Sequence, residues 1–215
     1  MFMIDNPGRF QQVFSAVAVA ASKGKNDPVI LTAVHMRGDG SKIIIEATDR
    51  YRVFSGTVPY EGEPFDLAVP ATVGADLKRA KAGRYAVLQF TVTDTHIDFE
   101  APGGRPSEDL ALRYVLVEGQ LPDIGKLYPE KTVRGFHGTA LDPILLADFA
   151  KAAKALGEKE PSMSFWQCAD AEGNPATERP VIVRFGGVED WVGIIMPLNR
   201  VNHDPGSDLA AEMYA

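Results

Sequence analysis

The sequence is poor in the features that mark disulfide-stabilised, metal-binding and membrane-spanning proteins. Its 215 residues include a single cysteine, Cys168, which excludes an internal disulfide and any site built from several cysteines. No apolar run approaches the ~20 residues that a membrane helix needs. The opening MFMIDNPGRF lacks the basic-then-apolar order of a signal peptide. We therefore expect a cytoplasmic protein that makes no membrane contact and uses no metal or cofactor.

Motifs for catalysis are missing as well. The sequence has no Gly-Lys-Ser/Thr phosphate loop, no Gly-x-Ser-x-Gly elbow and no His-Glu-x-x-His pair. His35 and His96 fall within strand patterns, where a hydrogen-bonded structural histidine is the usual role. Cys168 has no histidine or basic cluster near it in the sequence, which favours an inert thiol over a nucleophile. We predict that the protein is not an enzyme.

Acidic residues outnumber basic ones. Lys and Arg total 22 against 29 Asp and Glu, which gives a net charge of −7. This balance argues against a generally basic nucleic-acid binder, but it is compatible with one basic face on an acidic body.

Apolar residues follow strand and helix periods in an order that occurs three times. Each unit reads strand, helix, strand, strand, strand, and the units start near residues 1, 64 and 132. A period of roughly 65 residues is typical of a duplicated supersecondary unit. The first expected helix begins at Pro7 after an Asp5 or Asn6 cap. The second and third expected helices cover 70–82 and 141–156. The expected strands are 2–4, 29–36, 42–47, 51–58, 65–69, 85–92, 96–100, 110–117, 133–139, 162–166, 181–185 and 191–196.

A unit of this kind cannot bury its own sheet face and helix stripe, so units must pair. We predict an α+β fold in which residues 1–120 form a complete domain of two units and 121–131 a connector. Residues 132–200 then form a half domain of one unit, and 201–215 form a tail. Because an unpaired half domain exposes an apolar face, we expect it to dimerise or to pack against the tail.

Basic residues gather near the expected end of each helix. One explanation is a favourable interaction with the helix dipole together with solubility. The other is a row of helices that forms a cationic face for sequence-independent contact with phosphates. Charge alone leaves both open.

Four short segments, in order along the chain, resemble the bacterial DNA polymerase sliding clamp (beta clamp) family. The segment Ala47–Val53 resembles the family's Ala-Thr-Asp-Gly-His-Arg-Leu turn, and the Val-Pro of Val69–Ala71 looks like its entry into the next helix. The segment Glu118–Asp123 is similar to the Gly-x-Phe-Pro-Asp connector, and Ile194–Arg200 is similar to the closing Val-Val-Met-Pro-Met-Arg. The resemblance covers residues 1–200 and implies the DNA-clamp fold, built here from three units instead of the family's six per chain.

The chain also departs from that pattern. Arg50 and Tyr51 stand where the family's turn has Gly and His, so Arg50 is expected to need a positive φ, which is uncommon for arginine.

The resemblance implies a DNA replication processivity factor that encircles or contacts duplex DNA and tethers a polymerase, served by a clamp loader and forming a homo-oligomer. The DNA-contacting candidates are Arg9, Lys23, Lys25, Lys78, Arg79, Lys81, Lys151 and Lys154. Arg9 lies near a helix start, where the dipole gives it no favourable role.

The resemblance also implies a hydrophobic groove that accepts a short peptide from polymerases and other partners. Its candidates are Thr48, Tyr51, Arg52, Val53, Pro122, Lys126, Leu127, Ile194, Met196, Pro197 and Leu198. Arg52 and Lys126 could meet a peptide carboxylate or carbonyl. The plainer interpretation is that these residues form interdomain core. Residues 201–215 could cover the groove or mediate assembly.

A second hypothesis is a non-encircling, clamp-derived adaptor or decoy that binds replication proteins. The net acidity and the missing half domain favour it.

Overall fold

The computed structural model describes residues 2–103, 108–135 and 139–198. Within them the α-helices are α1 (Pro7–Val17), α2 (Val73–Arg79) and α3 (Pro143–Ala155). The 3-10 helices are η1 (Ala18–Ala20), η2 (Val29–Thr32), η3 (Ala82–Arg84) and η5 (Ile124–Leu127). The strands are β1 (Phe2–Ile4), β2 (Ala33–Gly38), β3 (Lys42–Thr48), β4 (Arg52–Pro59), β5 (Phe65–Pro70), β6 (Leu88–Val92), β7 (His96–Ala101), β8 (Leu110–Val115), β9 (Thr132–Arg134), β10 (Met163–Cys168), β11 (Val181–Phe185) and β12 (Trp191–Ile195).

The two longest helices begin with the same local signal. The side chain of Asn6 accepts a hydrogen bond from the backbone N–H of Arg9, and that of Asp142 accepts one from Ile144. A proline follows each cap, where its missing N–H costs nothing. The predicted Asn6 cap is confirmed.

Several predicted elements are shorter than expected. The predicted strand 29–36 is wrong in its first half, where η2 forms after Pro28 and the Thr32 hydroxyl donates to the Val29 carbonyl at 2.7 Å. The second helix begins only at Val73 because Pro70 still pairs with Ala33 in the sheet.

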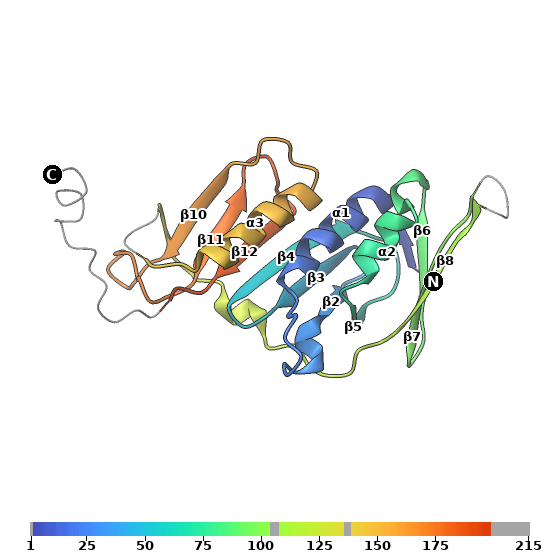
Figure 1. The fold of residues 1–215 in the computed structure, drawn as a ribbon, viewed down its shortest axis with the longest axis horizontal. Helices are drawn as coiled ribbons and strands as arrows, with labels where there is room; N and C mark the ends of the chain where they lie inside the picture. Colours follow the sequence, from blue (N-terminus) through green and yellow to red (C-terminus); the bar gives the residue numbers. More distant parts are fainter. Residues whose placement is uncertain (1, 104–107, 136–138, 199–215) are drawn as a thin grey trace.

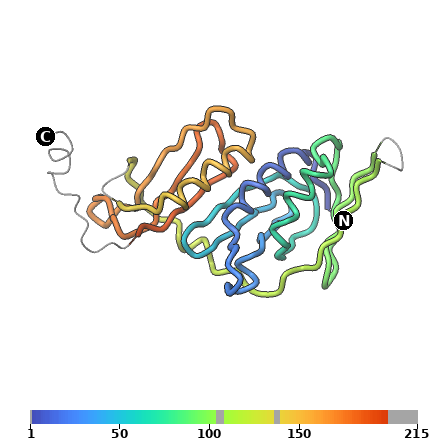
Figure 2. Tube along the Cα trace, in the orientation of Figure 1, coloured from blue at the N-terminus to red at the C-terminus, as the bar shows by residue number. Residues whose placement is uncertain are grey.

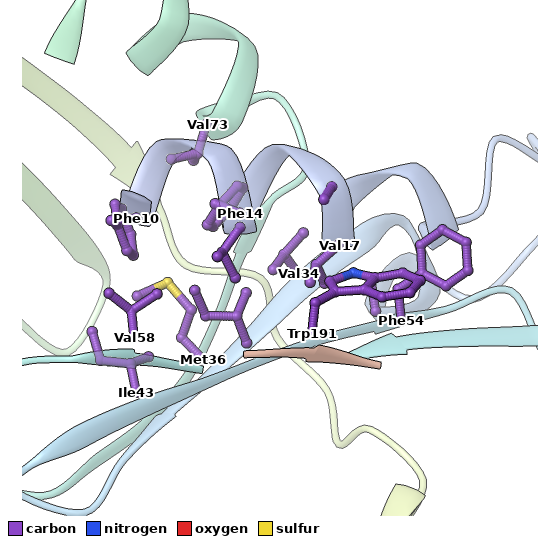
Figure 3. Packing of buried hydrophobic residues seen from close by; sticks show 14 of the residues in the cluster. Phe10, Phe14, Val17, Val34, Met36, Ile43, Phe54, Val58, Val73 and Trp191 are labelled. Carbon is purple, nitrogen blue, oxygen red and sulfur yellow. The ribbon is translucent and has the colours of Figure 1, made fainter. Parts of the chain in front are cut away.

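The first two units exchange their first strands. One sheet has the order β1-β6-β7-β8, so the first unit's β1 extends the second unit's sheet. Reciprocally, β5 of the second unit pairs with β2 of the first. Helices α1 and α2 cover the same face, where Phe10, Phe14 and Val73 pack toward Met36 and Val58 (Figure 3). The two units therefore share one core.

The third unit is built differently. Its first strand, β9, pairs with its own β10, and its last strand, β12, pairs antiparallel with β4. The result is an eight-stranded sheet in the order β5-β2-β3-β4-β12-β11-β10-β9. Figures 1 and 2 show the third unit beside the first, with α3, α1 and α2 along one side. The sheet face of the half domain is thus covered by α3 and joined to the first unit, while Ile144 on α3 remains 74% exposed. Residues 201–215, the predicted tail, lie outside the described residues.

Candidate nucleic-acid and peptide interfaces

Exposed cations lie on and beside two of the three helices. Lys78 and Arg79 end α2, Lys81 follows it, and Lys151 and Lys154 lie on α3. Arg79 pairs with Asp76 at 2.7 Å and Lys151 pairs with Asp148 at 2.5 Å. Within the described residues Lys78, Lys81 and Lys154 make no ion pair, so these ammonium groups are available to an anionic partner.

The first unit does not follow this pattern. Helix α1 ends at Val17 and has no basic residue in its last turn. The backbone tightens into η1 at Ala18 and becomes extended at Ala21, so the helix does not reach the basic residues that follow. Lys23 and Lys25 are exposed in the loop beyond it. The prediction that every helix end is basic is therefore wrong for α1.

Arg9 is held at the joint between the first and third units. Its Nε donates to an Asp190 carboxylate oxygen at 2.7 Å, a second nitrogen contacts the other oxygen, and a third donates to the Leu156 carbonyl at 3.2 Å. The hydrogen bond that Arg9 donates to the Asp190 carboxylate raises the pKa of Arg9 above its ordinary value. This guanidinium ties α1 to the end of α3 and to the start of β12.

The three segments of the predicted groove do converge. Val53 of β4 lies opposite Ile194 of β12, and the Met196 N–H donates to the Tyr51 carbonyl at 2.8 Å. The connector packs onto them, with Ile124 buried against Val53 and Ile194. Leu121, Leu127 and Tyr128 of the connector are half-buried against these three residues, and the six together form a small hydrophobic cluster.

Four of the groove candidates are buried. Val53 and Ile194 are 3% and 0% exposed, so they are core of the small cluster and do not line a cavity. The Thr48 hydroxyl donates to the Arg52 carbonyl at 2.7 Å. The four buried candidates, Thr48, Arg52, Val53 and Ile194, therefore lie in the protein interior under the site and cannot contact a ligand directly.

Arg52 has a structural partner that the sequence did not reveal. Its guanidinium pairs with Asp148 of α3 and with Asp49 at 3.2 Å, and it donates to the Val19 carbonyl at 3.2 Å. Burial raises the pKa of Asp148, but hydrogen bonds from Lys151 and Arg52 outweigh burial and leave it below its ordinary value. The expected role of Arg52 toward a peptide carboxylate is thus taken by a carboxylate of the chain itself.

A pocket of about 790 Å³ opens beside the small cluster. Its walls include Lys126, Leu127 and Met196 of the predicted groove, and it is also lined by Tyr128, Pro129 and Pro180. Tyr51 is 61% exposed and Pro122 is exposed, while Pro197 and Leu198 are half-buried. Tyr128 and Pro129 adjoin Leu127 in the connector and could have been found there, whereas Pro180 reaches the pocket only through the third unit's fold.

The turn that departs from the family pattern has the backbone expected of it. Arg50 adopts φ 81°, which confirms the prediction. The Thr48 hydroxyl accepts the Arg50 N–H at 3.0 Å, and the Arg50 guanidinium pairs with Asp27 at 2.6 Å. These contacts hold arginine where glycine would be unstrained.

The described residues give no sign of a metal centre or a reactive thiol. Among them, no three His, Cys, Asp or Glu side chains lie close enough to hold a metal ion, and no helix is long and apolar enough to cross a bilayer. Burial raises the pKa of the Cys168 thiol, which donates to the Pro180 carbonyl. His35 contacts Asp66 at 2.5 Å and His96 contacts Thr95 at 2.7 Å, which confirms the hydrogen-bonded structural histidines.

The architecture is similar to that of solved bacterial sliding clamps. No protein-family model and no curated protein matches the sequence. The DNA polymerase III beta chain of Streptococcus pneumoniae superposes with a TM-score of 0.71 at 15% identity, over 92% of this chain and 64% of that one. The beta subunit of Thermotoga maritima gives 0.70 at 11% identity, over 93% of this chain and 65% of that one.

A third match is the sliding clamp of Pseudomonas aeruginosa bound to griselimycin. It gives a TM-score of 0.62 at 14% identity, over 93% of this chain and 66% of that one. The chain is therefore clamp-like in fold, and it spans about 64% of the length of the first clamp it matches.

Proposed function

We propose that this chain is a non-enzymatic, clamp-like processivity factor that contacts duplex DNA through its helix layer and tethers a polymerase through a peptide bound at the pocket beside Met196. The observation that carries the proposal is the single layer of helices over joined sheets, with free ammonium groups at Lys78, Lys81 and Lys154. Contacts of this kind hold phosphates without reading base sequence.

DNA affinity and its salt dependence test the first half of the proposal. Replacing Lys78, Lys81 and Lys154 with alanine removes three phosphate contacts. The association constant should then depend less steeply on salt, with the magnitude of the negative slope of log K against log salt reduced by about 3. Fluorescence anisotropy with a labelled duplex measures both quantities. The matched control removes three exposed cations away from the helices, Lys42, Lys131 and Arg184, and should keep the original slope. Equal losses in both variants, or no binding by the parent chain, would overturn the DNA half.

The pocket supports the second half because it combines apolar walls with an exposed cation, Lys126, whose partner Asp123 lies 3.4 Å away. Leu127 and Met196 offer an adaptable apolar surface, and Lys126 is exposed at the rim. A fluorescent peptide copied from the clamp-binding segment of a bacterial polymerase is a suitable probe. Leu127→Ala with Met196→Ala should weaken its binding about tenfold or more, whereas Met163→Ala, at a 42% exposed methionine elsewhere, should not. Equal binding by both variants would contradict the assignment.

Two observations favour a non-encircling adaptor as the second candidate. The net charge is −7, and Arg9, one of the DNA-contacting candidates, is committed to the Asp190 carboxylate. An adaptor would bind the peptide without measurable affinity for duplex DNA, so the two assays above separate the candidates.

A further inference from the structure

An acidic side chain on the sheet face away from the helices has no cationic partner. Glu46 of β3 is only 8% exposed, and Ser55 of β4 donates its hydroxyl to one carboxylate oxygen at 3.1 Å. Within the described residues, nothing donates a hydrogen bond or brings a cation to the other oxygen. His35 lies opposite Glu46 on β2, but its Nε2 contacts Asp66 at 2.5 Å. Because buried charges in proteins are normally paired, Glu46 lacks the cation that its burial calls for.

Strand register places Glu46 among side chains of one sheet face. Two rows cross that face, Glu46–Ser55–Val192 and Arg37–Ile44–Thr57. Alternate residues of a strand point to the same side of a sheet. The intervening Ile45 and Phe54 are fully buried in the core under the helices. The two rows therefore form a surface on the opposite side of the sheet from that core.

The connector turns this surface into a cavity. A hollow of about 370 Å³ is lined by both rows and by Gly125 and Tyr128 of the connector. A second hollow of about 690 Å³ shares Arg37, Glu46 and Gly125 with the first, so Glu46 lies where the two meet. The small hydrophobic cluster holds the connector against the sheet. Of the residues that line the two hollows, only Tyr128 also lines the pocket beside Met196, so this cavity is distinct from that pocket.

Two arginines line the smaller hollow from opposite ends. Arg37 is on β2 and Arg184 is on β11, four strands away in the sheet, which places their backbones about 20 Å apart. Both are exposed, and neither makes a hydrogen bond or an ion pair within the part of the chain that the structure describes. Of the other acids that line this hollow, Asp190 is held by Arg9, and Glu189 is exposed. The cavity thus combines a buried carboxylate with a free cation at each end.

We propose that this cavity binds an arginine side chain of a partner protein, carried on an extended segment that has an acidic residue on either side of it. The guanidinium pairs with Glu46, and its planar set of donors can also meet the hydroxyl groups of the cavity wall. The flanking acids pair with Arg37 and Arg184. An extended segment advances about 3.4 Å per residue, so acids six residues apart span the distance between the two arginines. This inference is independent of the proposed function.

Titration calorimetry with the blocked peptide Asp-Ala-Ala-Arg-Ala-Ala-Asp, raised to millimolar concentration, tests the site. The parent chain should bind the peptide, and Glu46→Gln should raise the dissociation constant about 30-fold, because it removes one partner of a buried charge pair. Glu100→Gln makes the same change at an exposed glutamate of β7 and should bind like the parent chain. A parent chain that does not bind the peptide, or equal weakening by both variants, would overturn the proposal.

Altered peptides test each charge from the ligand's side. Citrulline in place of the peptide's arginine keeps the shape and removes the charge, so this peptide should bind the parent chain as weakly as the arginine peptide binds Glu46→Gln. Arg37→Ala should weaken the aspartate peptide about threefold, as expected for an exposed ion pair, and should leave a peptide with asparagine in place of aspartate unchanged. Equal binding of the citrulline and arginine peptides, or equal losses by Arg37→Ala with both flanking sequences, would contradict the assigned contacts.

Thermal unfolding without any ligand separates a binding role of Glu46 from a structural one. Glu46→Gln retains an acceptor for the Ser55 hydroxyl and removes a buried charge that has no cation. The melting temperature of the free chain should therefore stay the same or rise. A fall of several degrees would show that the charge of Glu46 stabilises the fold and would contradict its assignment to a ligand.

Discussion

The chain contains two kinds of contact between units: an exchange of strands between the first and second units, and a single strand ladder between the first and third. The first and second units exchange β1 and β5, so separating them breaks both sheets. The third unit keeps its first strand in its own sheet and meets the first through one ladder, the packing of α3 on α1, and buried side chains such as Phe149 and Trp191 that belong to the same hydrophobic cluster as Phe54. We therefore expect the first two units to unfold as one cooperative body, and the third unit, which is joined through a single ladder, to unfold before them.

The largest effect that would expose this difference is the loss of Phe149. Its ring is fully buried and lies 4.7 Å from that of Phe54 and 6.1 Å from that of Trp191, measured between centroids. Phe149→Ala should cost about 4 kcal/mol, from lost transfer energy and the cavity left behind. Chemical denaturation should show the third unit unfolding first, and hydrogen exchange should accelerate in β10 and β11 while β6 and β7 stay protected.

The matched variant for that comparison is Phe10→Ala, which removes an equally buried ring from the shared core of the first two units. It should raise exchange in both of their sheets together. If Phe149→Ala accelerated exchange in β6 and β7 as much as in β10 and β11, the third unit would not be separable.

A smaller effect, about 3 kcal/mol, is expected from Arg52→Ala. The substitution leaves Asp148, whose side chain is 8% exposed, with only the exposed Lys151 as a partner. Urea denaturation measures the loss. Because a buried ion pair contributes little beyond its own desolvation, Arg52→Met combined with Asp148→Leu should lose less stability than Arg52→Ala alone. A larger loss in the double variant would show that the pair itself stabilises the joint.

The sequence predicted local structure well where local signals decide it. Strands 2–4 and 181–185 have the predicted bounds, and the Asn6 cap follows from the residues themselves. The positive φ of Arg50 was predicted from the glycine at this position of the turn that the segment resembles. The errors lie where tertiary contacts decide. Val29 and Ile30 have strand propensity but form a 3-10 turn after Pro28. Of the predicted strand 133–139, β9 ends at Arg134, Gly135 and Thr139 are not in a strand, and residues 136–138 lie outside the described residues.

Contacts between residues far apart in the chain could not be predicted from the sequence. The unit repeat indicated that units pair, but not that β9 would stay in its own sheet. Arg52 and Asp148 are 96 positions apart, and Arg9 and Asp190 are 181 apart. Without coordinates, both arginines looked available to a ligand, because no periodicity or motif marks a carboxylate so distant as a partner.

The smallest expected loss of stability comes from removing Arg9, whose ion pair with Asp190 links the first unit to the third. The guanidinium and Asp190 are 25% and 30% exposed, so solvent screens the pair, and Arg9→Ala should cost about 1 kcal/mol of unfolding free energy. Arg79→Ala is the control, because Arg79 also forms an ion pair with an aspartate, Asp76, but its side chain is 79% exposed. Its loss should lower the free energy of unfolding by less than about 0.5 kcal/mol. Affinity for duplex DNA distinguishes the two arginines in the opposite sense. Arg79→Ala should weaken DNA binding, whereas Arg9→Ala should leave it unchanged because its donors already face Asp190 and Leu156. Weaker DNA binding by Arg9→Ala, without loss of stability, would instead place Arg9 on the DNA-contacting face and leave the joint to its ladder and aromatic rings.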